Sequence, residues 1–261
     1  MELKVLGCHG GESPKHQCPA FLLDNRVCLD AGSITNMLTL KEQQRLETVV
    51  VSHAHLDHVR DLAMLADTRT QQGGPPLTIA STPGTIAVLK RHFFNDRLWP
   101  DFSKIPDGKN PTVIFQSLKP ETETAICGVR IRPVLVDHAV EAAAFVVSDG
   151  HSAIAYSGDT GPTERLWEVL QEQPNLRALI MEVAFPNEQA KLARDSCHHT
   201  PKSLERELKK LGPERRDLPV LLFHIKPGFQ RQVEMQLAAL RARNTSIDGS
   251  SRSTNKRATL A

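Results

Sequence analysis

The segment that begins at His53 reads His-Ala-His-Leu-Asp-His and directly follows an apolar, β-branched run. In an extended chain alternate side chains point the same way, so His53, His55 and Asp57 can converge on one side. His58 would join them if Asp57 capped a following helix. Three imidazoles and a carboxylate suit Zn²⁺ or a similar borderline metal ion. Because the whole chain has only 11 histidines, we favour a metal site over a polar loop that happens to be rich in histidine.

Six consecutive residues cannot surround two metal ions, so further ligands should lie at the ends of other strands. Three polar residues each follow an apolar run: His138, Asp159 and His224. Any one of them alone would be read as an ordinary loop residue. Their shared position, in a chain that already has a metal motif, favours a role as ligands.

The elements that would position these residues alternate along the chain. Short apolar runs predict strands at residues 3–6, 48–51, 129–136, 142–147, 153–156, 178–181 and 220–223. Helical spacing of apolar residues predicts a helix from Pro162, one from Pro201 with Thr200 as its cap, and one at 232–243. Strands interleaved with helices indicate an α/β fold built in layers.

Length and composition limit the class of protein. The 261 residues include 40% hydrophobic and 24% charged residues, a mixture typical of globular proteins. No apolar run approaches the roughly 18 residues needed to cross a bilayer, and the first residues predict a strand and not a leader peptide. The five cysteines are scattered, without a Cys-x-x-Cys pair. We therefore expect a cytoplasmic protein without disulfides and without a membrane partner.

Charge is unevenly distributed. Residues 241–261 contain five basic side chains and one acidic one, which leaves 27 basic and 29 acidic residues in the body of the chain. This body gives no support for a face that would grip a long nucleic acid, and a small charged substrate suits it better. Residues 244–261 have almost nothing to bury, so we predict a disordered basic tail after a catalytic domain at residues 1–243.

The spacing His-x-His-x-Asp-His, a lone His, an Asp in Ser-Gly-Asp-Thr and a final His resembles the metallo-β-lactamase superfamily. The resemblance implies a four-layer αβ/βα sandwich, with two mixed β-sheets flanked by helices and a dinuclear metal site at one edge. It implies two divalent metal ions, of which zinc is the expected one and Mn²⁺ or iron are the alternatives. One ion would be held by His53, His55 and His138, the other by Asp57, His58 and His224, with Asp159 as the bridge and Asp30 orienting a ligand.

Three segments resemble the class II 3′,5′-cyclic-nucleotide phosphodiesterases of that superfamily. The first is the His53 segment itself, which departs from the pattern at Asp61, where a small residue is usual. The second, residues 92–102, is similar to His-x-Phe-Asn-x-x-x-Trp-Pro-Asp-Phe. The third comprises His-His-Thr-Pro at 198–201, similar to the family's His-Leu-Thr-Pro, and His-Ile-Lys-Pro at 224–227. The resemblance implies hydrolysis of cAMP or cGMP to a 5′-nucleoside monophosphate by a metal-bound hydroxide.

Three residues are predicted to bind the substrate. Asn95 and Trp99 belong to an aromatic and polar segment, and an aromatic wall with an amide suits a purine. The alternative for that segment is a small hydrophobic cluster under a long loop. Lys226 would offset charge on the phosphoryl oxygens.

Three residues are predicted to take part in catalysis. Glu182 ends a strand and His198 precedes a helix, a pairing that resembles the Glu and His of tRNA 3′-end endonucleases. A histidine held by a carboxylate is a suitable general acid, whereas the neighbouring His199 fits an ordinary surface histidine. Asp57 would orient or deprotonate the nucleophile.

The sequence is also compatible with other functions. A ribonuclease Z-like endonuclease that trims the 3′ end of tRNA precursors would share the ligands and the Glu182–His198 pair, but the mildly acidic body does not favour it. A thioester or lactam hydrolase is less favoured, because Asp57 and the Glu182–His198 pair suit phosphodiester chemistry better. A non-catalytic module that binds cyclic nucleotides would normally have lost a ligand. A small cyclic nucleotide is the expected partner, and a homodimer is left open.

Overall fold

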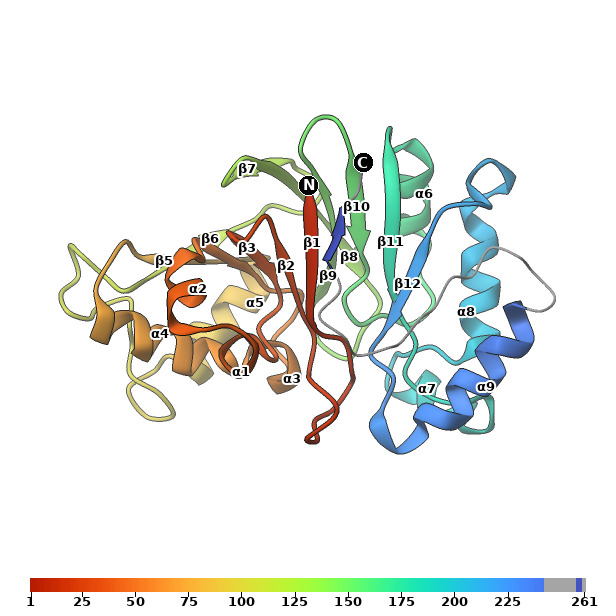
Figure 1. The fold of residues 1–261 in the computed structure, drawn as a ribbon, viewed down its shortest axis with the longest axis horizontal. Coiled ribbons are helices and arrows are strands. Elements are labelled where there is room, and N and C mark those ends of the chain that lie inside the picture. The colour runs from red at the N-terminus through yellow and green to blue at the C-terminus, as the bar shows by residue number, and fades with distance from the viewer. Residues whose placement is uncertain (242–256, 260–261) are drawn as a thin grey trace.

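Two mixed β-sheets face each other across the middle of the molecule, with helices on the outer side of each (Figure 1). The computed structural model describes residues 1–241 and 257–259. Within these residues, the spatial order in the first sheet is β13 (Arg257–Thr259), β1 (Glu2–Gly7), β2 (Ala20–Leu23), β3 (Val27–Leu29), β4 (Thr48–Val50), β5 (Leu77–Ser81) and β6 (Val113–Ser117). The order in the second is β12 (Val220–Phe223), β11 (Leu176–Glu182), β10 (Ala153–Tyr156), β9 (Ala142–Ser148), β8 (Val129–Val136) and β7 (Thr124–Ile126).

The helices form the two outer layers. Beside the first sheet lie α1 (Ile34–Met37), α2 (Leu40–Arg45), α3 (Leu56–Val59), α4 (Asp61–Gln72) and α5 (Pro83–Val88). On the side of the second sheet lie α6 (Arg165–Glu172), α7 (Ala190–Asp195), α8 (Pro201–Leu208) and α9 (Gln230–Arg241). Shorter turns are the π-helix η1 (Leu89–Phe93) and the 3₁₀ turns η2 (Asn187–Gln189), η3 (Lys209–Leu211), η4 (Pro213–Arg215) and η5 (Pro227–Phe229). This arrangement confirms the predicted four-layer αβ/βα sandwich.

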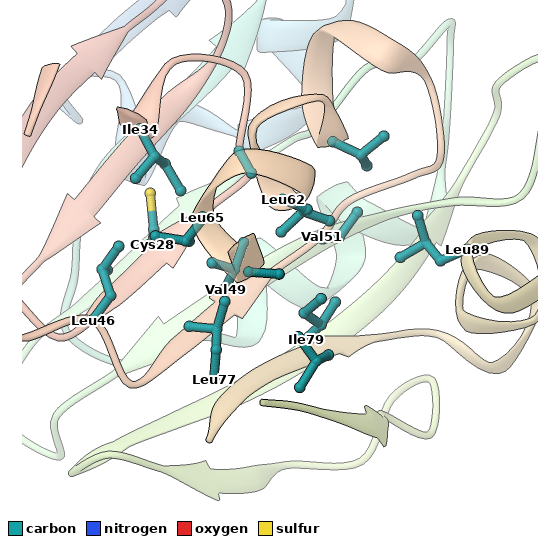
Figure 2. Packing of buried hydrophobic residues seen from close by; sticks show 14 of the residues in the cluster. Cys28, Ile34, Leu46, Val49, Val51, Leu62, Leu65, Leu77, Ile79 and Leu89 are labelled. Atoms are coloured by element: carbon teal, nitrogen blue, oxygen red, sulfur yellow. The ribbon is translucent and has the colours of Figure 1, made fainter. Parts of the chain in front are cut away.

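The valine run before the histidine segment shows how the layers are joined. Val49 and Val51 pack against the helices, whereas Val50 packs between the two sheets. Strand residues alternate between faces, so a strand covered on both sides must be apolar throughout. Figure 2 shows Leu62 and Leu65 of α4 directed toward Val49 and Val51, in one buried hydrophobic cluster. Burying each such side chain stabilises the fold by about 1.5–3 kcal/mol.

The helix predictions are correct in kind, with shifted boundaries. Thr200 caps α8 in a capping box with Ser203, and Pro201 is its first residue, as predicted. The prediction that a helix begins at Pro162 was wrong, because α6 begins at Arg165. The predicted helix at 232–243 begins two residues earlier, at Gln230, and its last two predicted residues lie outside the described part of the chain.

Several strands were missing from the sequence prediction. These are β2, β3, β5, β6 and β7, each three to five residues long. Strands this short give too few alternations for a clear pattern.

Most of the predicted disordered tail, residues 244–261, lies outside the described residues. Within it, Arg257–Thr259 forms β13 and pairs antiparallel with β1. Among the described residues no helix is long and apolar enough to cross a membrane. All five cysteines are unpaired.

Candidate metal centre and active site

The predicted site residues meet because several strands end at the same edge. Strands β10, β11 and β12 are parallel, and β8 runs in the same direction because both β8 and β10 are antiparallel to β9. The residues that follow their carboxyl ends therefore gather at one edge of the second sheet, where ligand sites of open sheets usually lie. In the first sheet, parallel β3 and β4 bring Asp30 and His53 to the facing edge.

The first group of candidate ligands consists of His53, His55 and His138. One nitrogen from each lies within 4.8 Å of the others. Nε2 of His138 is 3.2 Å from Nδ1 of His55, and the His53 and His55 ring centroids are 4.6 Å apart. Burial lowers the pKa of all three imidazoles. They are therefore neutral near pH 7, the form in which imidazole binds a metal.

The second group consists of Asp57, His58, Asp159 and His224, whose ligand atoms also lie within 4.8 Å of one another. Nε2 of His224 is 3.2 Å from Asp57 Oδ2 and 3.0 Å from Asp159 Oδ2. Burial would raise the pKa of the Asp159 carboxyl, but the neighbouring charges of His224 and His58 outweigh it and hold that pKa well below its usual value. This group therefore offers ionised carboxylates as well as imidazoles.

Asp159 lies between the two groups. Its Oδ2 is 3.3 Å from Nε2 of His58 in the second group and 3.8 Å from Nε2 of His53 in the first. A single carboxylate thus reaches both sets of imidazoles, which is the position that a ligand shared by two ions needs.

The donor set fits divalent metal ions. Nε2 of His53, Nε2 of His58 and Oδ1 of Asp159 are buried and have no hydrogen-bond partner within the described residues. Buried polar atoms are normally paired, so three unpaired atoms in one cluster indicate that another group completes their interactions. Imidazole and carboxylate donors at these separations suit zinc and its neighbours.

Asp30 holds one of these candidate ligands, His58, in orientation. Its buried carboxylate accepts hydrogen bonds from Nδ1 of His58 at 2.6 Å, from Ser52 N at 2.7 Å and from Tyr156 Oη at 2.5 Å. The bond to Nδ1 leaves Nε2 of His58 as the nitrogen that faces Asp159, a second contact of the kind that fixes a metal-binding tautomer. Ser52 and Tyr156 were not identified from the sequence, and their position after β4 and at the end of β10 is the only signal for them.

Glu182 and His198 form a buried pair. Nδ1 of His198 donates to Glu182 Oε1 at 3.2 Å, and the backbone N–H of His199 donates to the same oxygen at 3.1 Å. The His198 ring stacks on His224 with centroids 5.0 Å apart and an angle of 18°. His198 is also 5.2 Å from His138, so this pair lies beside both ligand groups.

His199 is not the surface histidine that the sequence suggested. It is fully buried, and its Nδ1 is 3.1 Å from Oγ of Ser203 on α8. It therefore anchors the helix entrance behind the Glu182–His198 pair.

The predicted substrate residues separate into two kinds. Lys226 lies at the edge of the site, with Nζ 3.9 Å from Asp57 Oδ2. The side-chain amide of Asn95 forms hydrogen bonds within its own loop. It donates to the carbonyl of Arg91 and accepts from the N–H of Leu98.

Trp99 is also held by local structure. Its indole N–H donates to the carbonyl of Ala63 on α4 at 3.1 Å, and its ring packs against the first-sheet core. Phe93, Phe94 and Phe102 of the same segment are buried in that core. These contacts favour the alternative of a hydrophobic cluster under a loop, and a pocket role for Asn95 and Trp99 stays a prediction.

The start of the helical region differs from the expected geometry. His55 and not Asp57 is the residue before α3, so Asp57 and His58 both lie within that helix.

The unusual Asp61 is buried at the start of α4, where Oδ2 accepts from Thr35 N at 2.7 Å and Thr35 Oγ1 at 2.8 Å. Asp61 thus ties the helices that follow the histidine segment to α1.

The β1–β2 loop closes on the second group. A Cβ atom on Gly10 would lie 2.4 Å from the carbonyl oxygen of His224 and 2.8 Å from its ring. The backbone N–H of His224 donates to the carbonyl of Cys8 at 2.7 Å. Only glycine allows this approach, so Gly10 is needed for the observed position of His224.

Comparison with known proteins gives related sequences. A protein of Yersinia pestis named "Probable 3',5'-cyclic-nucleotide phosphodiesterase" is 32% identical over 211 residues, which cover 72% of this chain and 60% of that protein. The match thus spans less than two thirds of that relative. A 3',5'-cyclic-nucleotide phosphodiesterase of Aliivibrio fischeri is 28% identical over 85% of this chain and 80% of its own length.

Solved structures share the fold. Unliganded yeast PDE1 superimposes with a TM-score of 0.81 at 18% identity and covers 95% of this chain and 97% of its own. The metallo-β-lactamase fold protein YhfI from Bacillus subtilis gives a TM-score of 0.77 at 18% identity, with 99% of both chains covered. The short form of human tRNase Z gives 0.72 at 16% identity, with 100% of both chains covered.

One family model identifies the chain directly. The model described as "Beta-lactamase superfamily domain" matches residues 25–225. This range is most of the chain and includes every candidate metal ligand. The chain belongs to the metallo-β-lactamase superfamily.

Proposed function

We propose that this protein is a metal-dependent phosphodiesterase that hydrolyses 3′,5′-cyclic nucleotides, cAMP or cGMP, to 5′-nucleoside monophosphates. The names of its relatives support the substrate class. The observation that carries the proposal is the Glu182–His198 pair stacked against His224, because it puts a candidate proton donor beside both ligand groups.

In this proposal His53, His55 and His138 would hold one divalent ion, and Asp57, His58 and His224 would hold the other, with Asp159 able to serve both. Zinc suits so many imidazoles, and Mn²⁺ or iron can use the same donors. When bound, the two ions supply Lewis acidity and lower the pKa of the water that attacks phosphorus.

The protein's own side chains then divide the remaining work. Asp57 orients the attacking water. His198, whose Nδ1 is held by Glu182, presents Nε2 and protonates the departing 3′ oxygen. Lys226 offsets charge on the phosphoryl oxygens from the edge of the site.

A cytoplasmic location and a homodimer remain parts of the proposal that rest on the sequence.

The test compares substrates under identical conditions. The purified chain is stripped with a chelator, reconstituted separately with Zn²⁺, Mn²⁺ or Fe²⁺, and assayed with cAMP, cGMP and a tRNA precursor that has a 3′ extension. We expect turnover of a cyclic nucleotide that is lost on chelation and restored by one of the metals. Trimming of the tRNA precursor without cyclic-nucleotide turnover would replace this proposal with the endonuclease.

A further inference from the structure

Two aromatic rings follow one another beside the proposed proton donor. Phe185, in the loop after β11, has its ring centroid 5.7 Å from that of His198. Phe229, at the end of the turn η5, lies 5.9 Å from Phe185. Phe185 forms a small apolar cluster with Ala184 and Ala193. Phe229 packs against this cluster and also against the core beneath the second sheet.

The turn that carries Phe229 also carries Lys226. The backbone N–H of Phe229 donates to the carbonyl of Lys226 at 2.9 Å, and the N–H of Lys226 donates to the carbonyl of Ala184 at 3.2 Å. The same short segment therefore presents an ammonium group beside Asp57 and an aromatic ring beside Phe185. One loop thus offers a contact for a phosphate and, a few residues on, a contact for an apolar group.

The two rings differ in accessibility. Phe185 is buried, with 8% of its surface exposed, whereas Phe229 is only partly buried. The neighbouring Gly228 is exposed, and a Cβ atom placed on it would meet no atom within 4 Å. The outer ring is therefore packed on one side and partly exposed on the other, next to a glycine whose surroundings are open.

We propose that Phe229, supported by Phe185, is the platform on which the base of the cyclic nucleotide stacks. This inference rests on the function proposed above. In a 3′,5′-cyclic nucleotide the phosphate is fused to the ribose, so the base lies one sugar ring away from the phosphorus. If His198 meets the 3′ oxygen, the succession of rings from His198 through Phe185 to Phe229 would put Phe185 beside the ribose and Phe229 beside the base. Purines have the larger stacking surface, so the platform favours them over pyrimidines.

The inference is tested by the preference for a purine. Kinetic constants for cAMP and cUMP are measured for the wild type and for Phe229→Leu, which keeps an apolar side chain but removes the aromatic face. We expect KM for cAMP to rise on the order of tenfold, with kcat changed by less than about threefold and a smaller rise for cUMP. Phe229→Trp should restore the purine preference. A purely structural role would change both substrates equally.

The controls separate the ways in which the test can fail. Phe115→Leu removes a partly buried ring from β6 and should leave the ratio of the two KM values unchanged, and thermal unfolding shows whether each variant is folded. An unchanged ratio in Phe229→Leu, or a changed ratio in Trp99→Leu alone, would overturn the platform and leave the phosphodiesterase proposal intact. A wild type that hydrolyses no cyclic nucleotide would overturn both.

Discussion

The two ligand groups of the candidate metal centre differ in charge. The first consists of three imidazoles whose pKa values are lowered by burial, so it offers neutral nitrogens alone. The second contains two carboxylates. Burial alone would lower the pKa of His58 and of His224, but the charge of Asp159 acts in the opposite direction, and both pKa values are raised. One group therefore offers neutral nitrogens alone, and the other combines imidazoles with ionised carboxylates.

This difference indicates that the two groups depend on their surroundings to different degrees. The neutral group needs only the placement of three rings. The charged group also needs hydrogen bonds that fix each proton, and Asp30 provides one of these. Asp159 is close to both groups, so we expect the whole centre to depend on it.

Loss of Asp159 should have the largest effect because it removes the one carboxylate near both groups. In Asp159→Ala we expect metal content, measured by mass spectrometry, and cyclic-nucleotide turnover to be lost together. His138→Ala is the matched comparison and should reduce only the first group's metal. Two bound ions in Asp159→Ala would show that the groups are independent.

His198→Ala should leave both groups occupied and slow the reaction. We expect kcat to fall about 10²–10⁴-fold, the usual range for general acid catalysis. Metal content should equal that of the wild type, since the ligands proposed above exclude His198. Full turnover in this variant would remove His198 from the mechanism.

Asp30→Asn should weaken the charged group alone. Loss of a partner that orients a ligand typically costs 10–100-fold in metal affinity. In a metal titration the affinity of the second group should therefore fall by this factor, while the affinity of the first group should not change. The shift can be followed by competition with a chromogenic chelator. Equal shifts in both steps would contradict the assignment of Asp30 to His58.

Asp61→Ala should have the smallest effect on chemistry and act mainly on stability. It removes the acceptor for two hydrogen bonds from Thr35. An unpaired buried donor costs about 1–3 kcal/mol, and because Thr35 is only partly buried we expect the lower end of that range. Thr35→Val keeps the backbone bond and should cost less. Denaturant unfolding measures both, and equal free energies of unfolding for wild type and Asp61→Ala would show that this tie is dispensable.

The sequence was most informative where the site is local. His53, His55, Asp57 and His58 come from one short segment, and their residue types alone predict a metal site. His138, Asp159 and His224 could be proposed only because each follows an apolar run and fits a family pattern. They meet because β8, β10 and β12 run in the same direction, which depends on pairing between distant strands.

Side-chain contacts could not be predicted in the same way. Tyr156 donates to Asp30 across 126 positions, a contact that no local pattern encodes. The aromatic residues at 92–102 are distinctive in composition, but composition does not say which way a ring points. Phe185 and Phe229 stand alone in the sequence and become neighbours only when the loops after β11 and β12 come together.

The identity of the product formed from cAMP tests the central claim most directly. The metal-loaded protein is incubated with cAMP, with and without a chelator, and the nucleotides are separated by chromatography. The account predicts 5′-AMP as the product and its loss in the presence of the chelator. Release of 3′-AMP would contradict the assignment of the 3′ oxygen as the leaving group, and undiminished turnover in the chelator would contradict the metal centre itself.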